Sequence, residues 1–359
     1  MNVSIQICLL VLFSSAGTSS QADSPVGWPW RGMVMNSFDS SAVDVQYLKE
    51  NLNLNFLALQ LKPRLRSQKY KLDPMEAFEQ ELDWAEQMLD ACVTQEVTAM
   101  LVIYQFPIDP TLGLDEKSPK FWDDPKSLDE VVRLSGIMAN RFAKRGNELS
   151  GYQVLSEPTV WRHGKPMRPE IWLETLQRII TMMRDLDKDC WIAVTPGPGG
   201  SPLSYEEFAL LPYKRIIYNA HMYLPHRYTH QGVKNRHLGP KYPGFVARSW
   251  WDKSKLTACL GHLRDFQMRN NVPVWVGEFS AARWAPGSED YIKDLVDIFE
   301  SYGWGWSYFQ YNGSHIWNPD YDDNYASNKR EEWTKHYIGK SSKRWDTLRS
   351  VFKVNKSSE

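Results

Sequence analysis

The feature of this sequence that most constrains its fold is a repeated alternation of short apolar segments with amphipathic helical segments. The apolar segments predict strands at residues 32–36, 55–61, 98–104, 151–155, 191–195, 215–221, 273–277 and 305–311. Strands that are apolar throughout and are separated by helices are typical of a parallel sheet covered by helices. Eight such units in one uninterrupted run favour a closed barrel over an open sheet. We therefore predict an α/β protein with a (β/α)8 TIM barrel.

The helical segments between these runs carry clear start signals and apolar faces. Asp73, followed by Pro74 and Glu76, predicts the first turn of a helix over residues 74–92. The same periodicity predicts further helices at residues 169–186, 252–268 and 288–301. An open nucleotide-binding sheet would usually show a Gly-rich phosphate turn after its first strand, and RGMVMNSFDSS contains none.

The N-terminus predicts a secretory signal peptide. The apolar stretch from Ile5 to Phe13 is too short to span a bilayer, and small residues follow it up to a predicted cleavage site near Ala22. We expect residues 1–22 to be removed and residues 23–359 to form a single barrel domain with a C-terminal tail. The mature protein is then expected to be secreted, either extracellular or periplasmic, with no membrane helix.

Charge, aromatic content and cysteine usage narrow the function classes. The chain has 42 Lys and Arg against 43 Asp and Glu, so we expect no general attraction to nucleic acid or to an anionic membrane. Sixteen Trp and seventeen Tyr favour a cleft that stacks sugar rings. Beyond the signal, Cys92, Cys190 and Cys259 are an odd set without close spacing, which predicts buried thiols with at most one disulfide.

Two glutamates follow apolar runs at the predicted ends of strands. Glu157, in YQVLSEPTVW, ends the fourth predicted strand, and Glu278, in VPVWVGEFSAARW, ends the seventh. The C-terminal strand ends of a barrel form one face, where strands four and seven lie opposite each other. Two carboxylates across a cleft are the minimum for cleaving a glycosidic bond. A lone Glu at a strand end is more often a salt bridge or a cap, but two at the same edge favour catalysis.

Four segments resemble those of glycoside hydrolase family five, the cellulase and mannanase family of two-Glu barrels. The similarity extends over residues 31–325 and is carried by LSGYQVLSEP, VPVWVGEFS, IIYNAHMYLPHRYTHQG and FWDDPKSLDEVVRL. The resemblance implies a retaining glycosidase that cleaves β-linked polysaccharide or oligosaccharide by double displacement. In that family the reaction needs no metal and no cofactor, so none is expected here.

By position, the resemblance implies that Glu157 is the acid/base and Glu278 the nucleophile. It implies that His221 and Tyr223 line the site, with Tyr223 hydrogen-bonded to the nucleophile. We expect an apolar pocket to raise the pKa of Glu157, while the Tyr223 phenol keeps Glu278 ionised. The alternatives, a buried structural imidazole for His221 and a rim aromatic for Tyr223, stay open.

The family pattern is broken on the second, third and fourth strands. Ser156 stands where the family has an Asn that contacts the sugar 2-hydroxyl. On the second strand the family's inward Arg is matched by Ala58, with Gln60, Lys62 and Arg64 further along. The third strand ends in VIYQFP, where the family has a His pair.

The sugar-stacking aromatic has two alternatives by position. On the last strand Trp306 matches the family's platform Trp, unless Phe309 replaces it. Trp284 and Trp317 are further candidates for stacking, and a core position fits each of them equally well.

The sequence argues against two other kinds of hydrolase and leaves one non-catalytic alternative. A metal-dependent barrel hydrolase would need His ligands at strand ends, but the first strand ends in MVMNSF, and His221, His226, His230 and His237 cluster in one loop. A serine hydrolase would need a Gly-x-Ser-x-Gly turn, which the sequence lacks. The main alternative is an inactive barrel that binds polysaccharide without cutting it. In either case we expect a monomer whose partner is a polysaccharide or oligosaccharide.

Overall fold

The computed structural model describes residues 24–107 and 115–356, and its centre is a closed barrel of eight parallel strands. Around the barrel the strands follow the order β1-β12-β11-β8-β7-β4-β3-β2. Their bounds are β1 Arg31–Asn36, β2 Phe56–Leu61, β3 Thr98–Ile103, β4 Leu149–Val154, β7 Ile192–Val194, β8 Ile216–Met222, β11 Val274–Phe279 and β12 Gly305–Tyr308. The predicted (β/α)8 barrel is confirmed. The predicted signal peptide, residues 1–22, lies outside the described residues.

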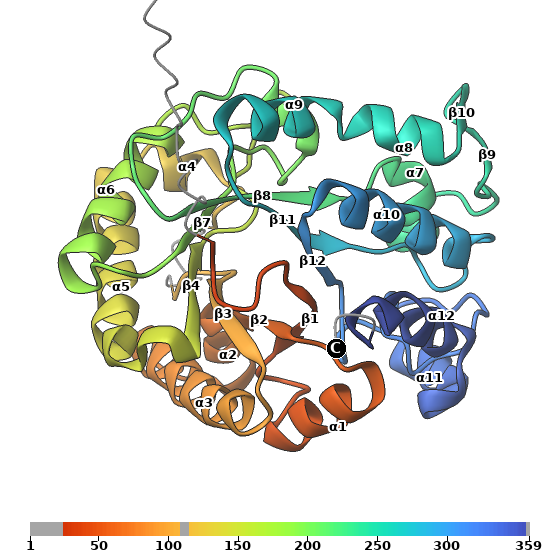
Figure 1. Ribbon diagram of the computed structural model, residues 1–359, viewed down its shortest axis with the longest axis horizontal. Helices are drawn as coiled ribbons and strands as arrows, with labels where there is room; N and C mark the ends of the chain where they lie inside the picture. Colours follow the sequence, from red (N-terminus) through yellow and green to blue (C-terminus); the bar gives the residue numbers. More distant parts are fainter. Residues whose placement is uncertain (1–23, 108–114, 357–359) are drawn as a thin grey trace, which may run out of the picture.

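Helices surround the barrel on its outside, as Figure 1 shows. The longer ones are α1 Ala42–Leu52, α2 Pro63–Tyr70, α3 Pro74–Thr94, α5 Pro125–Phe142, α6 Trp172–Leu186, α8 Lys253–Cys259, α9 Gly261–Asn270, α10 Ser288–Tyr302 and α12 Lys343–Val351. Short helices are α4 Pro119–Trp122, α7 His226–Thr229 and α11 Arg330–Trp333, and 3-10 turns span Ala143–Glu148, Pro202–Tyr205, Val233–Asn235, Thr334–His336, Gly339–Ser341 and Phe352–Lys356.

The helix boundaries follow the local sequence signals. The Asp73 side chain accepts hydrogen bonds from the backbone N–H groups of Met75 and Glu76, which confirms the predicted start of α3. The predicted helix over residues 252–268 is instead two helices, α8 and α9, which meet at Leu260. The helices α1, α3, α5, α6, α10 and α12 each bury apolar side chains in the same core as the strands, so helix and strand register are fixed together.

Two short antiparallel hairpins extend from the loops that follow barrel strands. The first, after β4, pairs β5 (Val160–Arg162) with β6 (Lys165–Met167). The second, after β8, pairs β9 (Gly244–Val246) with β10 (Ser249–Trp251) and projects at the upper right of Figure 1. Both hairpins therefore belong to loops at the C-terminal ends of the strands.

The described residues also test the predictions on membrane helices and on cysteines. Over residues 24–107 and 115–356, no helix combines the length and apolarity that crossing a bilayer requires. Cys92, Cys190 and Cys259 are free thiols; the first two are buried, and Cys259 is half-buried.

Aromatic side chains fill the barrel interior at the N-terminal ends of its strands. Trp275 on β11 contacts the rings of Trp30 and Phe56 edge to face, at centroid distances of 6.0 and 5.5 Å. Its indole N–H donates to Ser307 Oγ at 2.9 Å, so the one polar atom of this buried ring is satisfied. This cluster closes one end of the barrel and leaves the other end for a site.

Replacing Trp275 by Ala should lower the free energy of unfolding by about 3–5 kcal/mol, because the cavity left in the interior cannot collapse. Trp161→Ala is the matched control, since that indole is 50% exposed on β5 and its loss should cost less than about 0.5 kcal/mol. Urea unfolding measures both. Equal destabilisation by the two changes would contradict this account of the core.

Candidate active site

Glu157 and Glu278 meet at the C-terminal end of the barrel. Glu278 lies within β11, is buried, and faces the mouth. Glu157 lies three residues beyond the end of β4, in a bend where Leu155 has a positive φ of 57°, and its side chain is 25% exposed. The prediction that Glu157 ends the strand is therefore wrong in detail. The chain turns first and then presents the carboxylate to the cleft.

A register shift places Glu278 at its position on β11. The pairing of β11 with β8 runs regularly to Val276 and then slips, so Glu278 lies beside His221. Gly277 lies at the slip, where its N–H donates to Asn219 Oδ1 at 2.8 Å. A Cβ on Gly277 would lie 2.5 Å from that oxygen, so a larger residue at this position would displace the Asn219 side chain and disturb the backbone directly before Glu278.

The Glu278 carboxylate accepts hydrogen bonds from two other parts of the barrel. The Tyr223 hydroxyl, directly after β8, donates to Oε2 at 3.0 Å, and Gln60 Nε2, on β2, donates to Oε1 at 2.8 Å. Ala58 lies one layer deeper among apolar side chains. The prediction that Ala58 takes the place of the family's supporting residue is therefore wrong. Gln60, with a neutral amide, does so, since side chains two apart share a strand face.

His221 connects the two carboxylates. Its ring is buried, and Nδ1 lies 3.0 Å from Glu157 Oε1 and 3.6 Å from Glu278 Oε2. Gly200, in the Gly-rich loop after β7, accepts the His221 backbone N–H and packs against the ring. A Cβ on Gly200 would lie 2.8 Å from the imidazole Cγ, so this loop holds the ring in place.

The electrostatics of the three groups differ from the sequence-based expectation. Burial raises the pKa of Glu278, and although the positive charge of His221 opposes it, the charge of Glu157 adds to it, so the pKa lies above its ordinary value. At Glu157, burial also acts to raise the pKa, but the hydrogen bond and charge of His221 outweigh it and lower the pKa. At His221, burial acts to lower the pKa, but the two carboxylates outweigh it and raise the pKa.

The predicted directions for the two carboxyl groups are therefore wrong for the unliganded protein. The physical reason is His221, whose Nδ1 lies 3.0 Å from Glu157 Oε1 and whose hydrogen bond and positive charge lower the pKa of that carboxyl group. A raised pKa of His221 contributes stability that is lost as pH rises through it, and a lowered pKa of Glu157 contributes stability that is lost as pH falls through it. The ion pair thus stabilises the fold between these two pKa values.

Trp306 does not belong to the site. Its side chain is 0% exposed and lies on the outer side of β12, between Phe279 and Phe352. The indole N–H donates to Glu300 Oε1 on α10 at 2.7 Å. The prediction of a sugar platform at Trp306 is wrong, because strand alternation turns this side chain toward the helices.

Phe309 and Trp317 lie near the catalytic pair instead. Phe309 follows β12 and meets the Tyr223 ring edge to face at 6.3 Å, and Trp317 lies 5.5 Å from Phe309. Trp317 is half-buried, and its indole N–H has no partner among the described residues. Trp284 is nearly buried, and its N–H donates to the Gln231 carbonyl, so it is a core residue. Phe309 and Trp317 are the aromatic candidates for contact with a sugar.

Ser156 lies at the edge of a small cavity beside Glu157. The cavity has a volume of about 180 Å³, and Tyr104, Arg64 and Glu116 also line it. Ser156 is 2% exposed, and its Oγ has no hydrogen-bond partner among the described residues. An unpaired buried hydroxyl is costly, so it is available to a ligand hydroxyl group.

Two further residues near the carboxylates had weaker sequence signals. Lys62, one residue beyond β2, lies over the Tyr104 ring at 5.4 Å, and its charge acts to lower the pKa of Glu278. Tyr104 follows β3 at the position where the family has a His pair, and burial, followed by the charges of Glu157 and Glu278, raises its pKa. For Lys62, the available sequence signal was its place two residues after Gln60 and four after Ala58, on the same face of the second strand. The sequence did not show which of the three lies at the level of the carboxylates.

Glu157, His221 and Glu278 also have the atom types of a metal site. One ligand atom each of Glu157, His221 and Glu278 lies within 4.8 Å of the others. Both Glu278 oxygens already accept hydrogen bonds, and His221 Nδ1 is paired with Glu157. This set of contacts fits an acid–base cluster better than it fits a cation site.

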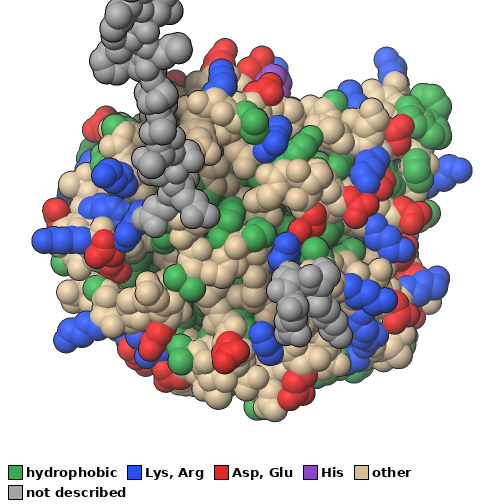
Figure 2. Space-filling model, viewed as in Figure 1, with side chains coloured by type: hydrophobic (Ala, Val, Ile, Leu, Met, Phe, Trp, Pro, Cys, Tyr) green, Lys and Arg blue, Asp and Glu red, His purple; other side chains and the backbone are tan. Residues whose placement is uncertain are grey.

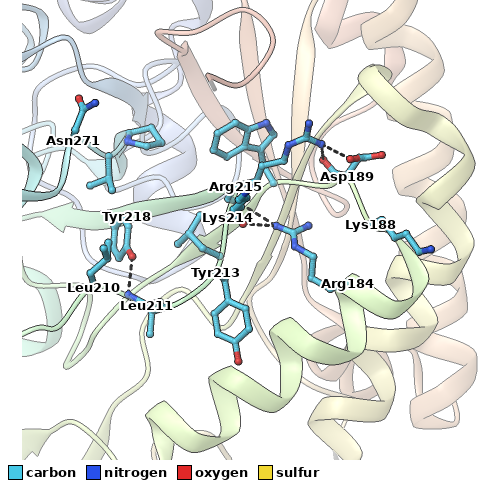
Figure 3. Close-up of a pocket in the computed structure, with 14 residues that line it drawn as sticks. Arg184, Lys188, Asp189, Leu210, Leu211, Tyr213, Lys214, Arg215, Tyr218 and Asn271 are labelled. Atoms are coloured by element: carbon cyan, nitrogen blue, oxygen red, sulfur yellow. Dashed lines mark hydrogen bonds and ion pairs between the residues drawn. The ribbon is translucent and has the colours of Figure 1, made fainter. Parts of the chain in front are cut away.

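A separate cavity of about 520 Å³ lies at the N-terminal ends of β7, β8 and β11, away from the carboxylates. Figure 3 shows Arg215 paired with Asp189, and Arg184 bonded to backbone carbonyl groups beneath it. The guanidinium groups of Arg215 and Arg184 are thus bound by groups of the protein itself. The cavity therefore belongs to the closed end of the barrel and not to the site.

The comparisons with known proteins agree with this geometry. The family model for cellulase, glycosyl hydrolase family 5, matches residues 20–315. Among solved structures, Thermotoga maritima Cel5A in complex with mannotriose is 16% identical, with a TM-score of 0.66 over 90% of this chain and 97% of that chain. The cellulose synthase subunit Z of Clostridioides difficile is also 16% identical, with a TM-score of 0.64 over 92% and 95%.

A third solved structure, an endoglucanase, is 14% identical, with a TM-score of 0.65 over 89% of this chain and 96% of that chain. A search of curated protein sequences found no match. At these sequence identities, the structural similarity shows a shared fold. Fold and family model together define a glycoside hydrolase barrel. The chain belongs to the cellulase family, glycosyl hydrolase family 5.

The proton between His221 and Glu157 can be tested by titration. In Glu157→Gln, the pKa of His221 should fall, because burial remains while one carboxylate charge and its hydrogen bond are lost. NMR of the imidazole nitrogens against pH measures this shift directly. Glu148→Gln, an exposed carboxyl at the opposite end of the barrel, should leave the His221 pKa unchanged. An unchanged pKa in Glu157→Gln would show that the pair does not share the proton.

Proposed function

We propose that this protein is a retaining glycosidase that cleaves β-linked polysaccharide or oligosaccharide, with Glu278 as nucleophile and Glu157 as acid/base. The observation that carries the proposal is the distance between the carboxylates: one oxygen of Glu157 lies within 4.8 Å of one oxygen of Glu278. Carboxyl groups about 5–5.5 Å apart fit direct attack on the anomeric carbon, whereas about 6.5–9.5 Å leaves room for an intervening water. The short separation supports retention.

In the first step, a Glu278 oxygen attacks the anomeric carbon while Glu157 gives a proton to the departing glycosidic oxygen. The glycosidic bond breaks as the bond to Glu278 forms. Gln60 and Tyr223 hold the Glu278 carboxylate in place, and the pKa of Tyr223 is raised by burial and by Glu278, so its phenol remains a donor. In the second step, Glu157 takes a proton from water, which then displaces the sugar from Glu278.

The proton that Glu157 must donate is already at the site. We infer that in the unliganded protein it rests on His221 Nδ1, which lies 3.0 Å from Glu157 Oε1 and belongs to an imidazole whose pKa the two carboxylates raise. Transfer along this hydrogen bond converts the ion pair into a neutral imidazole and a neutral carboxylic acid. A bound sugar that excludes water would favour this neutral form, because charged groups lose their hydration.

The alternative function is a barrel that binds polysaccharide without cutting it. Ser156 in place of the family's Asn favours that alternative, since one contact to the sugar 2-hydroxyl would be weaker. Gln60, His221 and Tyr223 favour activity, because these donors hold both carboxylates in the cleft. Buried acids cost stability unless they are paired or used.

Reducing-sugar release from β-glucans, mannans and xylans tests the proposal. Glu157→Gln should lower kcat by about 10²–10⁴-fold on substrates with poor leaving groups, because proton donation is lost. Glu278→Gln should reduce activity to background on every substrate. Glu207→Gln, an exposed carboxyl far along the chain from both, is the matched control and should retain activity.

The two roles can be separated by adding azide to the Ala variants with an activated aryl β-glycoside. Azide should yield a β-glycosyl azide with Glu157→Ala, since the glycosyl-enzyme still forms, and an α-glycosyl azide with Glu278→Ala, since azide replaces the nucleophile. The reverse pattern would exchange the roles. Polysaccharide binding without release by the wild-type protein would favour the non-catalytic alternative.

Secretion is proposed from residues 1–22 alone, and a monomer from the absence of any feature in the sequence that calls for assembly. Export is tested by expressing the full chain and sequencing the N-terminus of the protein recovered outside the cell. Cleavage near Ala22 is the expected result. Size-exclusion chromatography with light scattering tests the oligomeric state.

A further inference from the structure

The hairpin of β9 and β10 presents two aromatic side chains to solvent. Phe245 is 72% exposed and Trp250 is 50% exposed, and they are cross-strand partners whose rings meet edge to face at 5.2 Å. Val246 and Trp251, on the other face of the hairpin, are buried. The hairpin therefore has its core on one side and an aromatic pair on the other, which core packing does not explain.

This surface is visible at one edge of the molecule. In Figure 2, apolar side chains gather at the upper right, where Figure 1 places β9 and β10, and basic side chains lie beside them. No membrane or protein partner is needed to hold the hairpin, because its buried face already packs on the barrel domain. The exposed pair is free to contact a ligand.

The loop that carries the hairpin is strongly basic. Residues 225–255 contain seven Lys and Arg and a single acid, Asp252, although Lys and Arg balance Asp and Glu over the whole chain. Arg227, Arg236 and Arg248 are exposed, and among the described residues no carboxylate forms an ion pair with them. Arg236 donates only to the Val233 carbonyl. Three guanidinium groups without a carboxylate partner among the described residues, beside an aromatic pair, favour an anionic ligand with flat apolar faces.

The basic loop and the catalytic site are joined through the segment that directly follows β8, which carries Tyr223, His226 and Arg227. Arg227, Arg236 and Phe245 line a cavity of about 320 Å³. The His226 ring, next in the chain to Arg227, lies 6.4 Å from the ring of Tyr223, which donates to the nucleophile. Burial, followed by the charges of His226 and Arg236, lowers the pKa of His230 to about 3, and the His230 ring lies 5.2 Å from the Tyr223 ring.

We propose that Arg227, Arg236, Arg248, Phe245 and Trp250 form a basic hairpin surface that binds a polysaccharide bearing carboxylate groups as it leaves the cleft. The inference rests on the proposed function and names the substrate class of that site. The guanidinium groups pair with the carboxylates, and the aromatic pair stacks on sugar rings. The bound chain extends from the carboxylates across the cavity to the hairpin.

Carboxymethylcellulose and hydroxyethylcellulose of equal chain length test this, because they share a backbone and differ in charge. Binding is measured by affinity electrophoresis with Glu278→Gln, so that hydrolysis does not intervene. The charged polymer should bind at least about tenfold tighter at low salt, and salt should remove most of the difference. Phe245→Ser/Trp250→Ser should weaken binding to both polymers by about tenfold, because stacking is lost.

The matched charge variants are Arg227→Gln/Arg236→Gln and Lys144→Gln/Lys188→Gln. Both remove two exposed positive charges, but Lys144 and Lys188 lie at the opposite, N-terminal end of the strands. The first should lose at least about fivefold of the preference for carboxymethylcellulose, and the second should keep it. Equal losses would overturn the proposal, since net charge alone would then explain the preference.

Three other outcomes would also overturn it: equal affinity for the two polymers, unchanged binding in Phe245→Ser/Trp250→Ser, or binding to phosphatidylglycerol vesicles through these aromatics without binding to either polymer. Wild-type hydrolysis is scored separately. Hydrolysis without charge preference overturns only the basic hairpin surface. Charge-selective binding without hydrolysis of any polymer supports the surface and overturns the proposed glycosidase.

Discussion

The buried carboxylate of Glu278 is the constraint around which the mouth of this barrel is organised. A carboxylate in that position is tolerated only because two donors come to it from separate strands, Gln60 from β2 and Tyr223 from the end of β8, while His221 Nδ1 lies 3.6 Å away. β2 and β8 are not neighbours in the barrel. Closure of the sheet is therefore what brings a donor from the far side to the same carboxylate.

His221 gives the site a second property, because it couples the two carboxyl groups through one proton. With the proton on the imidazole, Glu157 is ionised, and with it on Glu157 the cleft holds a neutral acid beside an ionised nucleophile. The two states contain the same number of protons and differ only in position along a 3.0 Å contact. The Gly200 loop, which presses on the ring, keeps that contact short.

Much of the fold and part of the site could be predicted from the sequence. All eight barrel strands were placed to within about three residues, because apolar runs and helix caps are local signals. The assignments that failed depended on which way a side chain points or on how deep in the barrel it lies. Trp306 faces the helices, since a one-residue change of register reverses a strand's faces, and Ala58 shares the face of Gln60 but lies two residues deeper in the barrel. The sequence pattern located those strands but not their register.

By itself the sequence determined the eight alternating units, the two glutamates behind apolar runs, and the membership of a known family, all of which are written in short contiguous segments. Only the tertiary structure decided that Gln60 supports Glu278, that His221 Nδ1 lies against Glu157, and that Phe309 and not Trp306 faces the cleft. These depend on distances between residues up to 218 positions apart. Burial and charge act through space, so pKa values and donor partners are fixed only when the barrel closes.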